Sequence, residues 1–184
     1  MFNTIEGGAI VCPDAKTKQR IDHLKNFGIV DETTVVAPGI NGKMSEINAA
    51  FGMLQLQYIE QALERRREIA TLYRRKLSSV RGIDIISGKK IGATNYSYFP
   101  ILVQPEYPIT RDELYQKLKE HNIFSRRYFY PLITNFPMYR GLASARPDNL
   151  PVAEDIASKV LCLPIHPALT KQESDRVIKI ISDI

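Results

Sequence analysis

Apolar side chains recur every three or four positions through residues 45–77, which is the spacing of one face of an amphipathic helix. Ser45 is placed to cap the start of this helix, and Glu46 puts a favourable negative charge in its first turn. The pattern predicts one long helix, in which Gly52 and residues 65–67 are the places for a bend. The apolar positions are Ile47, Phe51, Leu54, Tyr58, Ala62, Ile69, Leu72, Tyr73 and Leu77.

The segment before this helix predicts a strand, a shorter helix and a loop. An apolar run at residues 8–12 follows a glycine and ends at a proline, as expected of a buried strand. Asp14 then caps a helix that stops at Gly28. Residues 31–43 are rich in polar and turn-forming residues and lead as a loop to the long helix.

The pattern changes beyond Ser78 to short strands that alternate with capped helices. Two capping boxes, at residues 110–113 and 170–173, start helices, and Pro151 starts a third. Residues 131–149 form a loop that is long enough to be a functional segment. The expected strands cover residues 80–86, 96–103, 123–130 and 160–163, and the first two are joined by a loop at residues 87–92. The fold class is therefore α/β, and the C-terminal part is expected to be a small α+β domain.

Composition fits an ordinary globular protein of one domain or a small pair of subdomains, with 184 residues of which 44% are hydrophobic and 24% charged. No segment approaches the roughly 20 apolar residues of a membrane helix, and the first residues form no basic leader. We expect a soluble, cytoplasmic protein with no membrane partner. Cys12 and Cys162 lie far apart on apolar runs, which indicates reduced core residues, and no cysteine and histidine share the spacing of a zinc site.

The formal net charge of +5 raises the alternative of a nucleic-acid-binding module. Much of the excess lies at residues 64–68 and 74–76. Glu64 and Glu68 stand at helical neighbour positions of these basic residues, and no aromatic platform accompanies them. A solvated helix face therefore explains the charge better than a nucleic-acid surface, and we expect no nucleic-acid partner. A positive surface would also attract an anionic substrate.

Two segments carry a resemblance to a known family. Residues 37–52 contain an Asn, a basic residue, the triplet Met-Ser-Glu and two alanines in an order that resembles a signature of the DegT/DnrJ/StrS sugar-nucleotide aminotransferases. Residues 2–9 are similar to the segment that follows the lysine to which these enzymes bind pyridoxal phosphate (PLP). The resemblance implies the aspartate-aminotransferase fold, and it covers almost the whole chain.

The resemblance also implies a division of the chain. Residues 1–44 would be the end of a large PLP-binding domain, residues 45–78 a linking helix, and residues 79–184 a small α/β domain. The strand at residues 8–12 would then lack its neighbours, and its apolar face would favour association.

No catalytic residue is expected in this chain. The family's lysine should stand one or two residues before Phe2, outside this sequence, and the aspartate under the cofactor's pyridine nitrogen belongs to the other half of the family's length. Lys16, Lys18 and Lys25 lack the sequence context of the PLP lysine, since solvated lysines stay charged and a reactive one must be desolvated. The chain alone is expected to be inactive.

Two cofactor-binding residues follow from the resemblance. Asn41 lies between Ile40 and Gly42, and on residue type alone a turn explains it best. By resemblance its amide donates to the PLP phosphate bound by the partner subunit, which implies a homodimer. Lys43 either supports the same phosphate or the nucleotide, or is an ordinary exposed lysine.

Residues 126–132 are similar to a family segment that reads basic, aromatic, aromatic, Pro, Leu. A guanidinium binds phosphate and aromatic rings cover a sugar or base, so Arg127, Tyr128 and Tyr130 are candidate substrate contacts. Strand alternation predicts Arg127 and Phe129 on one face and the two tyrosines on the other. A plain amphipathic edge strand is the alternative.

His166 is the remaining candidate substrate contact. It stands between prolines in a loop where relatives carry His, Tyr or Phe, and the alternative is a loop histidine with no role.

The activity that the resemblance implies is transfer of an amino group from glutamate, through PLP, to a keto-sugar nucleotide. The sequence of residues 126–132 favours a dTDP-linked 3-keto-6-deoxyhexose as the substrate. A non-catalytic interaction domain and a basic nucleic-acid-binding module are the competing hypotheses.

Overall fold

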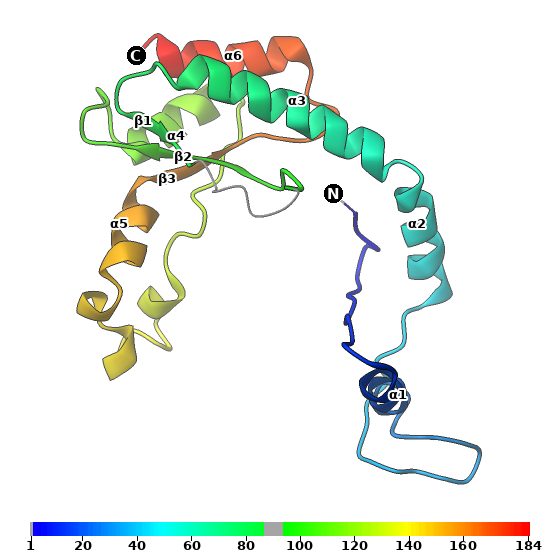
Figure 1. Cartoon of the computed structure of the whole chain (residues 1–184). Coiled ribbons are helices and arrows are strands. Elements are labelled where there is room, and N and C mark those ends of the chain that lie inside the picture. The colour runs from blue at the N-terminus through cyan, green and yellow to red at the C-terminus, as the bar shows by residue number, and fades with distance from the viewer. Residues whose placement is uncertain (1, 87–93) are drawn as a thin grey trace. The chain divides into compact units, whose positions relative to one another are not determined.

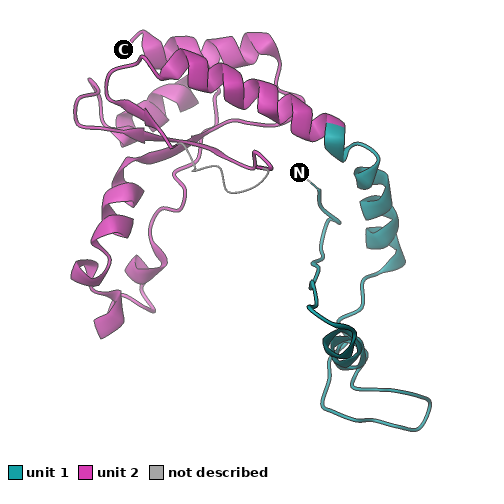
Figure 2. Ribbon diagram, viewed as in Figure 1, with its two compact units in different colours: residues 1–60 teal, residues 61–184 magenta. Residues whose placement is uncertain are grey.

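A computed structural model describes residues 2–86 and 94–184 of the chain (Figure 1). The chain divides into two units, residues 1–60 and residues 61–184, which Figure 2 colours separately. The loop expected at residues 87–92 lies outside the described residues.

The second unit contains a three-stranded antiparallel sheet in the order β1-β2-β3. Phe99, Ile101 and Val103 alternate with less buried residues along β2, which is the period of a strand with one face on a core. Three of the four expected strands are therefore confirmed: β3 has the expected bounds, and β1 and β2 are shorter than expected. Their bounds are β1 Ile83–Ile85, β2 Phe99–Val103 and β3 Val160–Leu163.

Helices cover both faces of this sheet. α3, Ile59–Leu77, and α6, Lys171–Ser182, lie on one side, and α5, Pro151–Lys159, lies on the other (Figure 1). α4, Arg111–Glu120, contacts β3 and α6. The core between these elements is closed to solvent, and each large apolar side chain buried there contributes about 1.5–3 kcal/mol. Its most buried members include Ile69, Tyr73, Leu77, Ile101, Leu114, Leu118, Leu161 and Ile181.

Both expected capping boxes are confirmed, at the starts of α4 and α6. The Thr110 backbone nitrogen donates to Glu113 Oε2 at 2.7 Å, and the Glu113 nitrogen donates to Thr110 Oγ1 at 3.3 Å. Thr170 and Glu173 make the same pair of bonds at 2.8 and 3.2 Å. Hydrogen bonds from the threonine backbone and hydroxyl hold the pKa of each glutamate below its ordinary value.

The first unit contains α1, Ala15–Leu24, and α2, Glu46–Leu56. Both start as the sequence predicts: Asp14 Oδ1 accepts from the Thr17 nitrogen at 2.7 Å, and Ser45 Oγ accepts from the Asn48 nitrogen at 3.2 Å.

The prediction of one helix over residues 45–77 is wrong. α2 ends at Leu56, and α3 starts at Ile59. The Gln57 and Tyr58 nitrogens donate to carbonyls three residues earlier, at 3.2 and 3.1 Å, so the last turn tightens and the α-helical ladder stops. No proline or glycine marks this position in the sequence, which explains why periodicity missed it.

The expected buried strand at residues 8–12 is also wrong. Ile10 is 71% exposed and Val11 95% exposed, and no strand among the described residues pairs with them. A strand forms only where a neighbour satisfies its backbone N–H and C=O groups, and residues 2–60 provide none. Cys12, expected in a core, is half-buried.

The fourth expected strand, at residues 123–130, is wrong as well. Only Arg126 pairs with the sheet, in an isolated bridge to Cys162, and the chain turns at Tyr128 and Phe129. Beyond it the long loop contains three 3₁₀ turns, η1 Ile133–Asn135, η2 Ala143–Ala145 and η3 Pro147–Asn149.

Within residues 2–86 and 94–184, no helix has both the length and the apolarity to cross a bilayer. The same residues contain no group of three or more His, Cys, Asp or Glu side chains that could hold a metal ion. Cys12 and Cys162 are both free thiols.

Gly82 should tolerate no side chain. Its φ is +79°, and a Cβ would lie 2.2 Å from the Tyr107 nitrogen. We predict that Gly82→Ala lowers the free energy of unfolding by about 1–3 kcal/mol. The control is Gly141→Ala, because a Cβ there meets nothing within 4 Å. Urea unfolding followed by circular dichroism measures both, and equal stability of the two variants would contradict the prediction.

Cys162 should resist alkylation, because burial raises the pKa of its thiol to about 11. At pH 8 we expect iodoacetamide to modify Cys162 about a hundredfold more slowly in the folded chain than in urea, since the thiolate is the nucleophile. The half-buried Cys12 provides the internal comparison, and mass spectrometry of peptides follows both. Rapid modification of Cys162 without unfolding would show that the residue is accessible.

Candidate functional site

The segment that carries the candidate substrate residues is attached to the sheet by one backbone pair. The Arg126 nitrogen donates to the Cys162 carbonyl at 3.0 Å, and the Cys162 nitrogen donates to the Arg126 carbonyl at 2.8 Å. Cys162 lies in the middle of β3, whose four residues are all buried. These bonds therefore fix where residues 127–130 leave the sheet.

Arg127 is held at its guanidinium by three side chains. Its Nη1 donates to Asp112 Oδ1 at 3.0 Å, and its Cζ lies 4.6 Å from the ring centre of Tyr115 and 5.2 Å from that of Tyr130. The side chain is 33% exposed, and its other N–H groups have no hydrogen-bond partner among the described residues. Arg127 can therefore offer several donors to an anion while one donor anchors it.

Arg111 lies behind this group, with 4% of its side chain exposed. Its Nη1 donates to the Ala157 and Val160 carbonyls at 2.9 and 3.1 Å, at the C-terminal end of α5. Its Nε donates to Asp112 Oδ1 at 2.9 Å, and its Cζ lies 4.9 Å from the Tyr130 ring centre.

Sequence reasoning missed Arg111 and Asp112, because the capping box alone explained their segment. A signal was present. A basic residue at the first position of a helix is unfavourable to the helix dipole, so Arg111 at that position in α4 indicates a partner elsewhere in the fold.

Tyr128 stacks between two aromatic neighbours. Its ring centre lies 4.3 Å from that of Tyr98 and 3.9 Å from that of Phe129. Desolvation and a hydrogen bond with Tyr98 hold the pKa of Tyr128 above its ordinary value. The expected alternation is therefore wrong: Tyr128 stacks on Phe129, and Arg127 contacts Tyr130, because the chain turns at residues 128–129 instead of continuing as a strand.

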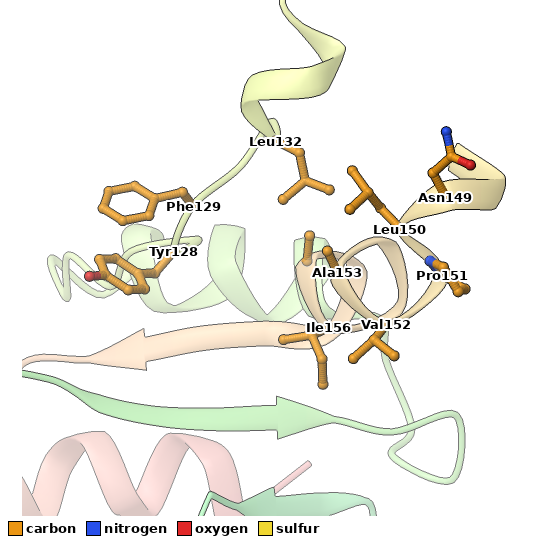
Figure 3. Close-up of a pocket in the computed structure, with 10 residues that line it drawn as sticks. Tyr128, Phe129, Leu132, Asn149, Leu150, Pro151, Val152, Ala153 and Ile156 are labelled. Atoms are coloured by element: carbon orange, nitrogen blue, oxygen red, sulfur yellow. The ribbon is translucent and has the colours of Figure 1, made fainter. Parts of the chain in front are cut away.

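An apolar cavity of about 530 Å³ lies beside this aromatic pair. Figure 3 shows Tyr128 and Phe129 on one side of it and side chains of α5 and the preceding turn on the other. Such walls suit the flat face of a base or the apolar carbons of a deoxysugar better than they suit a charged group. The lining residues that complete it are Leu132, Asn149, Leu150, Pro151, Val152, Ala153, Ile156 and Ala157.

His166 lies in the exposed loop between β3 and α6. Its carbonyl accepts from the Leu169 nitrogen at 3.0 Å, and its charge contributes to lowering the pKa of Glu173. No hydrogen bond, ion pair or ring contact among the described residues connects it to Arg127, Tyr128 or Tyr130, whereas Arg127 and Tyr130 contact each other.

Asn41 and Lys43 belong to the first unit. The Ile40 and Gly42 nitrogens donate to the Leu24 and Lys25 carbonyls at 2.9 and 2.8 Å, so backbone bonds fasten the loop to the end of α1 on both sides of Asn41. The Asn41 side chain is exposed, and its amide has no partner among the described residues.

Lys43 is exposed too, with Nζ 5.3 Å from the Phe27 ring centre. An amide donor on a fixed backbone with an ammonium two residues away is a donor set that fits the phosphate of PLP.

Comparisons with known proteins identify relatives in sequence and in fold. A crystal structure of DesI in the presence of its TDP-sugar product superposes with a TM-score of 0.86 at 32% identity, over 98% of this chain and 46% of that one. The dTDP-4-amino-4,6-dideoxy-D-glucose transaminase of Escherichia coli is 57% identical over 96% of this chain and 47% of its own length. A transaminase of the same description from Shigella dysenteriae is 48% identical over 100% of this chain and 50% of its own.

The chain thus spans about half the length of the curated relatives that it matches. The α/β fold class and the fold of PLP-dependent sugar aminotransferases, both expected from the sequence, are confirmed for the part that it covers. The sequence pattern of one family matches residues 1–182. This chain belongs to the DegT/DnrJ/EryC1/StrS aminotransferase family.

Proposed function

We propose that this chain forms about half of a PLP-dependent enzyme that transfers an amino group from glutamate to a keto-sugar nucleotide. Family membership supplies the reaction class. The observation that carries the substrate class is Arg127, a partly exposed guanidinium with unused donors beside a stack of aromatic rings and an apolar cavity. An anionic diphosphate joined to a flat base and a deoxysugar matches those three features.

The substrate that we propose is dTDP-4-keto-6-deoxyglucose. Two relatives, at 57% and 48% identity, are named for a product with its amino group at C4. Transamination places nitrogen on a carbon that carried a carbonyl, so a C4 amine requires a C4 ketone. This 4-keto substrate replaces the 3-keto sugar that the sequence of residues 126–132 favours.

Each candidate residue has a role in this proposal. Arg127 donates to the diphosphate, and Tyr128 with Phe129 covers the base or the deoxysugar. Tyr130 contacts the substrate edge-on while its ring supports Arg127. His166, exposed in the β3–α6 loop, is kept as a contact to the sugar hydroxyls.

PLP, when bound, draws electrons from the carbon that gains or loses the amino group. Asn41 donates its amide N–H to the phosphate of this cofactor, and Lys43 adds a positive charge two residues further along the loop. We propose that the phosphate belongs to the partner subunit's cofactor, so that a homodimer is needed for the site to be complete.

The nucleic-acid hypothesis finds no support in the first of the two basic clusters that suggested it, at residues 64–68 of α3. Arg65 and Arg67 are paired with Glu68 and Glu64, each at 2.6 Å. Arg66 is 8% exposed and donates to the Tyr96 carbonyl at 3.0 Å. The basic residues of this turn are therefore engaged within the fold, and the surface they leave is close to neutral.

The substrate proposal predicts a preference between two ketones. With glutamate and PLP, the full-length enzyme should convert dTDP-4-keto-6-deoxyglucose with a kcat/KM about a hundredfold or more above that for the 3-keto isomer, because polar groups placed for one carbonyl stay unpaired with the other. Chromatography with mass spectrometry detects the amino sugar. Preference for the 3-keto isomer would overturn the substrate, and conversion of neither would favour a non-catalytic interaction domain.

The cofactor proposal predicts that Asn41→Ala weakens PLP affinity of the full-length enzyme by about ten- to a hundredfold, since a hydrogen bond to a charged group is worth about 1.5–3 kcal/mol. Asn41→Asp should weaken it further by placing a carboxylate against a phosphate. Equilibrium titration of PLP followed by absorbance measures affinity without relying on activity.

Asn26→Ala is the matched control, because Asn26 pairs with Asn41 through the backbone only. Unchanged PLP affinity in both Asn41 variants would leave Asn41 as an ordinary turn residue.

A further inference from the structure

Two guanidinium groups share one carboxylate oxygen in the first turn of α4. Asp112 Oδ1 lies 2.9 Å from Arg111 Nε and 3.0 Å from Arg127 Nη1. Two cations and one anion leave a net positive charge on this group. The Asp112 side chain is 55% exposed, so the carboxylate is at the surface while one of its partners is buried.

Arg111 cannot reach a ligand itself. Only 4% of its side chain is exposed, and its Nη1 is bonded to the Ala157 and Val160 carbonyls at the end of α5. These bonds fix the Arg111 guanidinium, and the guanidinium in turn fixes the carboxylate of Asp112. The buried end of the network is therefore rigid.

Arg127 is the exposed end of the same network. An arginine side chain carries considerable rotamer freedom, and a binding site loses affinity when it must order such a side chain. Asp112 holds one N–H group of Arg127, and Tyr115, one helical turn further along α4, lies against the guanidinium at 4.6 Å. The first turn of α4 thus sets the orientation of Arg127 before any ligand arrives.

We propose that Asp112 is a positioning residue for the sugar nucleotide: it holds the Arg127 guanidinium so that its remaining N–H groups face the diphosphate. This inference rests on the proposed function, in which Arg127 contacts that diphosphate. Asp112 acts through Arg127 and touches neither substrate nor cofactor.

The negative charge of Asp112 opposes this role, because a carboxylate close to the site repels a diphosphate. Arg111 offsets that repulsion, since its guanidinium is bonded to the same oxygen. Arg127 also keeps donors that Asp112 does not use. Loss of the carboxylate should therefore weaken nucleotide binding rather than strengthen it.

Asp112 can be replaced without removing the start of α4. The capping box uses Thr110 and Glu113, and α6 has the same box with the neutral Gln172 in the position that Asp112 occupies in α4. Asp112→Asn is therefore compatible with the local fold. Asp175→Asn is the matched control, because Asp175 is a half-exposed aspartate of α6 with a single ion pair, to Lys171 at 2.8 Å.

The test is calorimetric titration of dTDP into the full-length enzyme. We expect Asp112→Asn to weaken dTDP binding about three- to fivefold, and Asp175→Asn to leave it unchanged. In steady-state kinetics, Asp112→Asn should raise KM for the sugar nucleotide and leave KM for glutamate and kcat unchanged, a split that general destabilisation would not produce.

The Arg127→Ala background separates this inference from the proposed function. Asp112→Asn should have no further effect there, because it acts only through Arg127. If Arg127→Ala leaves dTDP affinity unchanged, the diphosphate contact in the proposed function is wrong, and the role of Asp112 fails with it. If Arg127→Ala weakens dTDP binding, three results for Asp112→Asn overturn the positioning role alone. These are tighter dTDP binding, unchanged dTDP binding, or an equal loss of dTDP affinity in the wild-type and Arg127→Ala backgrounds.

Discussion

The backbone pair between Arg126 and Cys162 determines what the rest of the candidate site can do. β3 is buried along its whole length and is paired with β2, so Cys162 has no freedom to move without disrupting the core. The two hydrogen bonds at 3.0 and 2.8 Å transfer that rigidity to Arg126. The chain then turns, which places Arg127 against the first turn of α4 and the rings of Tyr128 and Phe129 beside the apolar cavity. A rigid scaffold with a short exposed segment is a common arrangement for a binding site.

Arg111 connects this segment to the remainder of the second unit. One buried guanidinium contacts the end of α5, the start of β3, the side chain of Asp112 and the ring of Tyr130. The same residue therefore satisfies the carbonyls at a helix end and supports the aromatic group next to Arg127. A substitution of Arg111 would therefore change both the stability of the fold and the geometry of the site. Asp112 lies at the exposed end of the network, so its substitution is the better way to test the site without destabilising the fold.

The sequence predicted what depends on local signals. Both capping boxes are where residue type and spacing place them, because those signals act within a few residues. The strand at residues 123–130 failed because one tertiary bridge and a turn replaced regular pairing. The break in the helix after Leu56 was not predicted, because no helix-breaking residue marks it. Arg127, Tyr128 and Tyr130 were proposed from the resemblance, whereas Asp112 and Arg111 were not, since their local role at the helix start concealed their partners.

The central claim is that residues 127–130 bind the sugar nucleotide, and a crystal structure of the full-length enzyme with dTDP tests it most directly. The account predicts that a diphosphate oxygen lies within hydrogen-bonding distance of the Arg127 guanidinium, with Asp112 still bonded to its Nη1. It also predicts that Tyr128 and Phe129 lie against the thymine ring, or against the space beyond the diphosphate that the deoxysugar of the substrate would occupy. A nucleotide bound elsewhere, with Arg127 exposed to solvent, would contradict the claim.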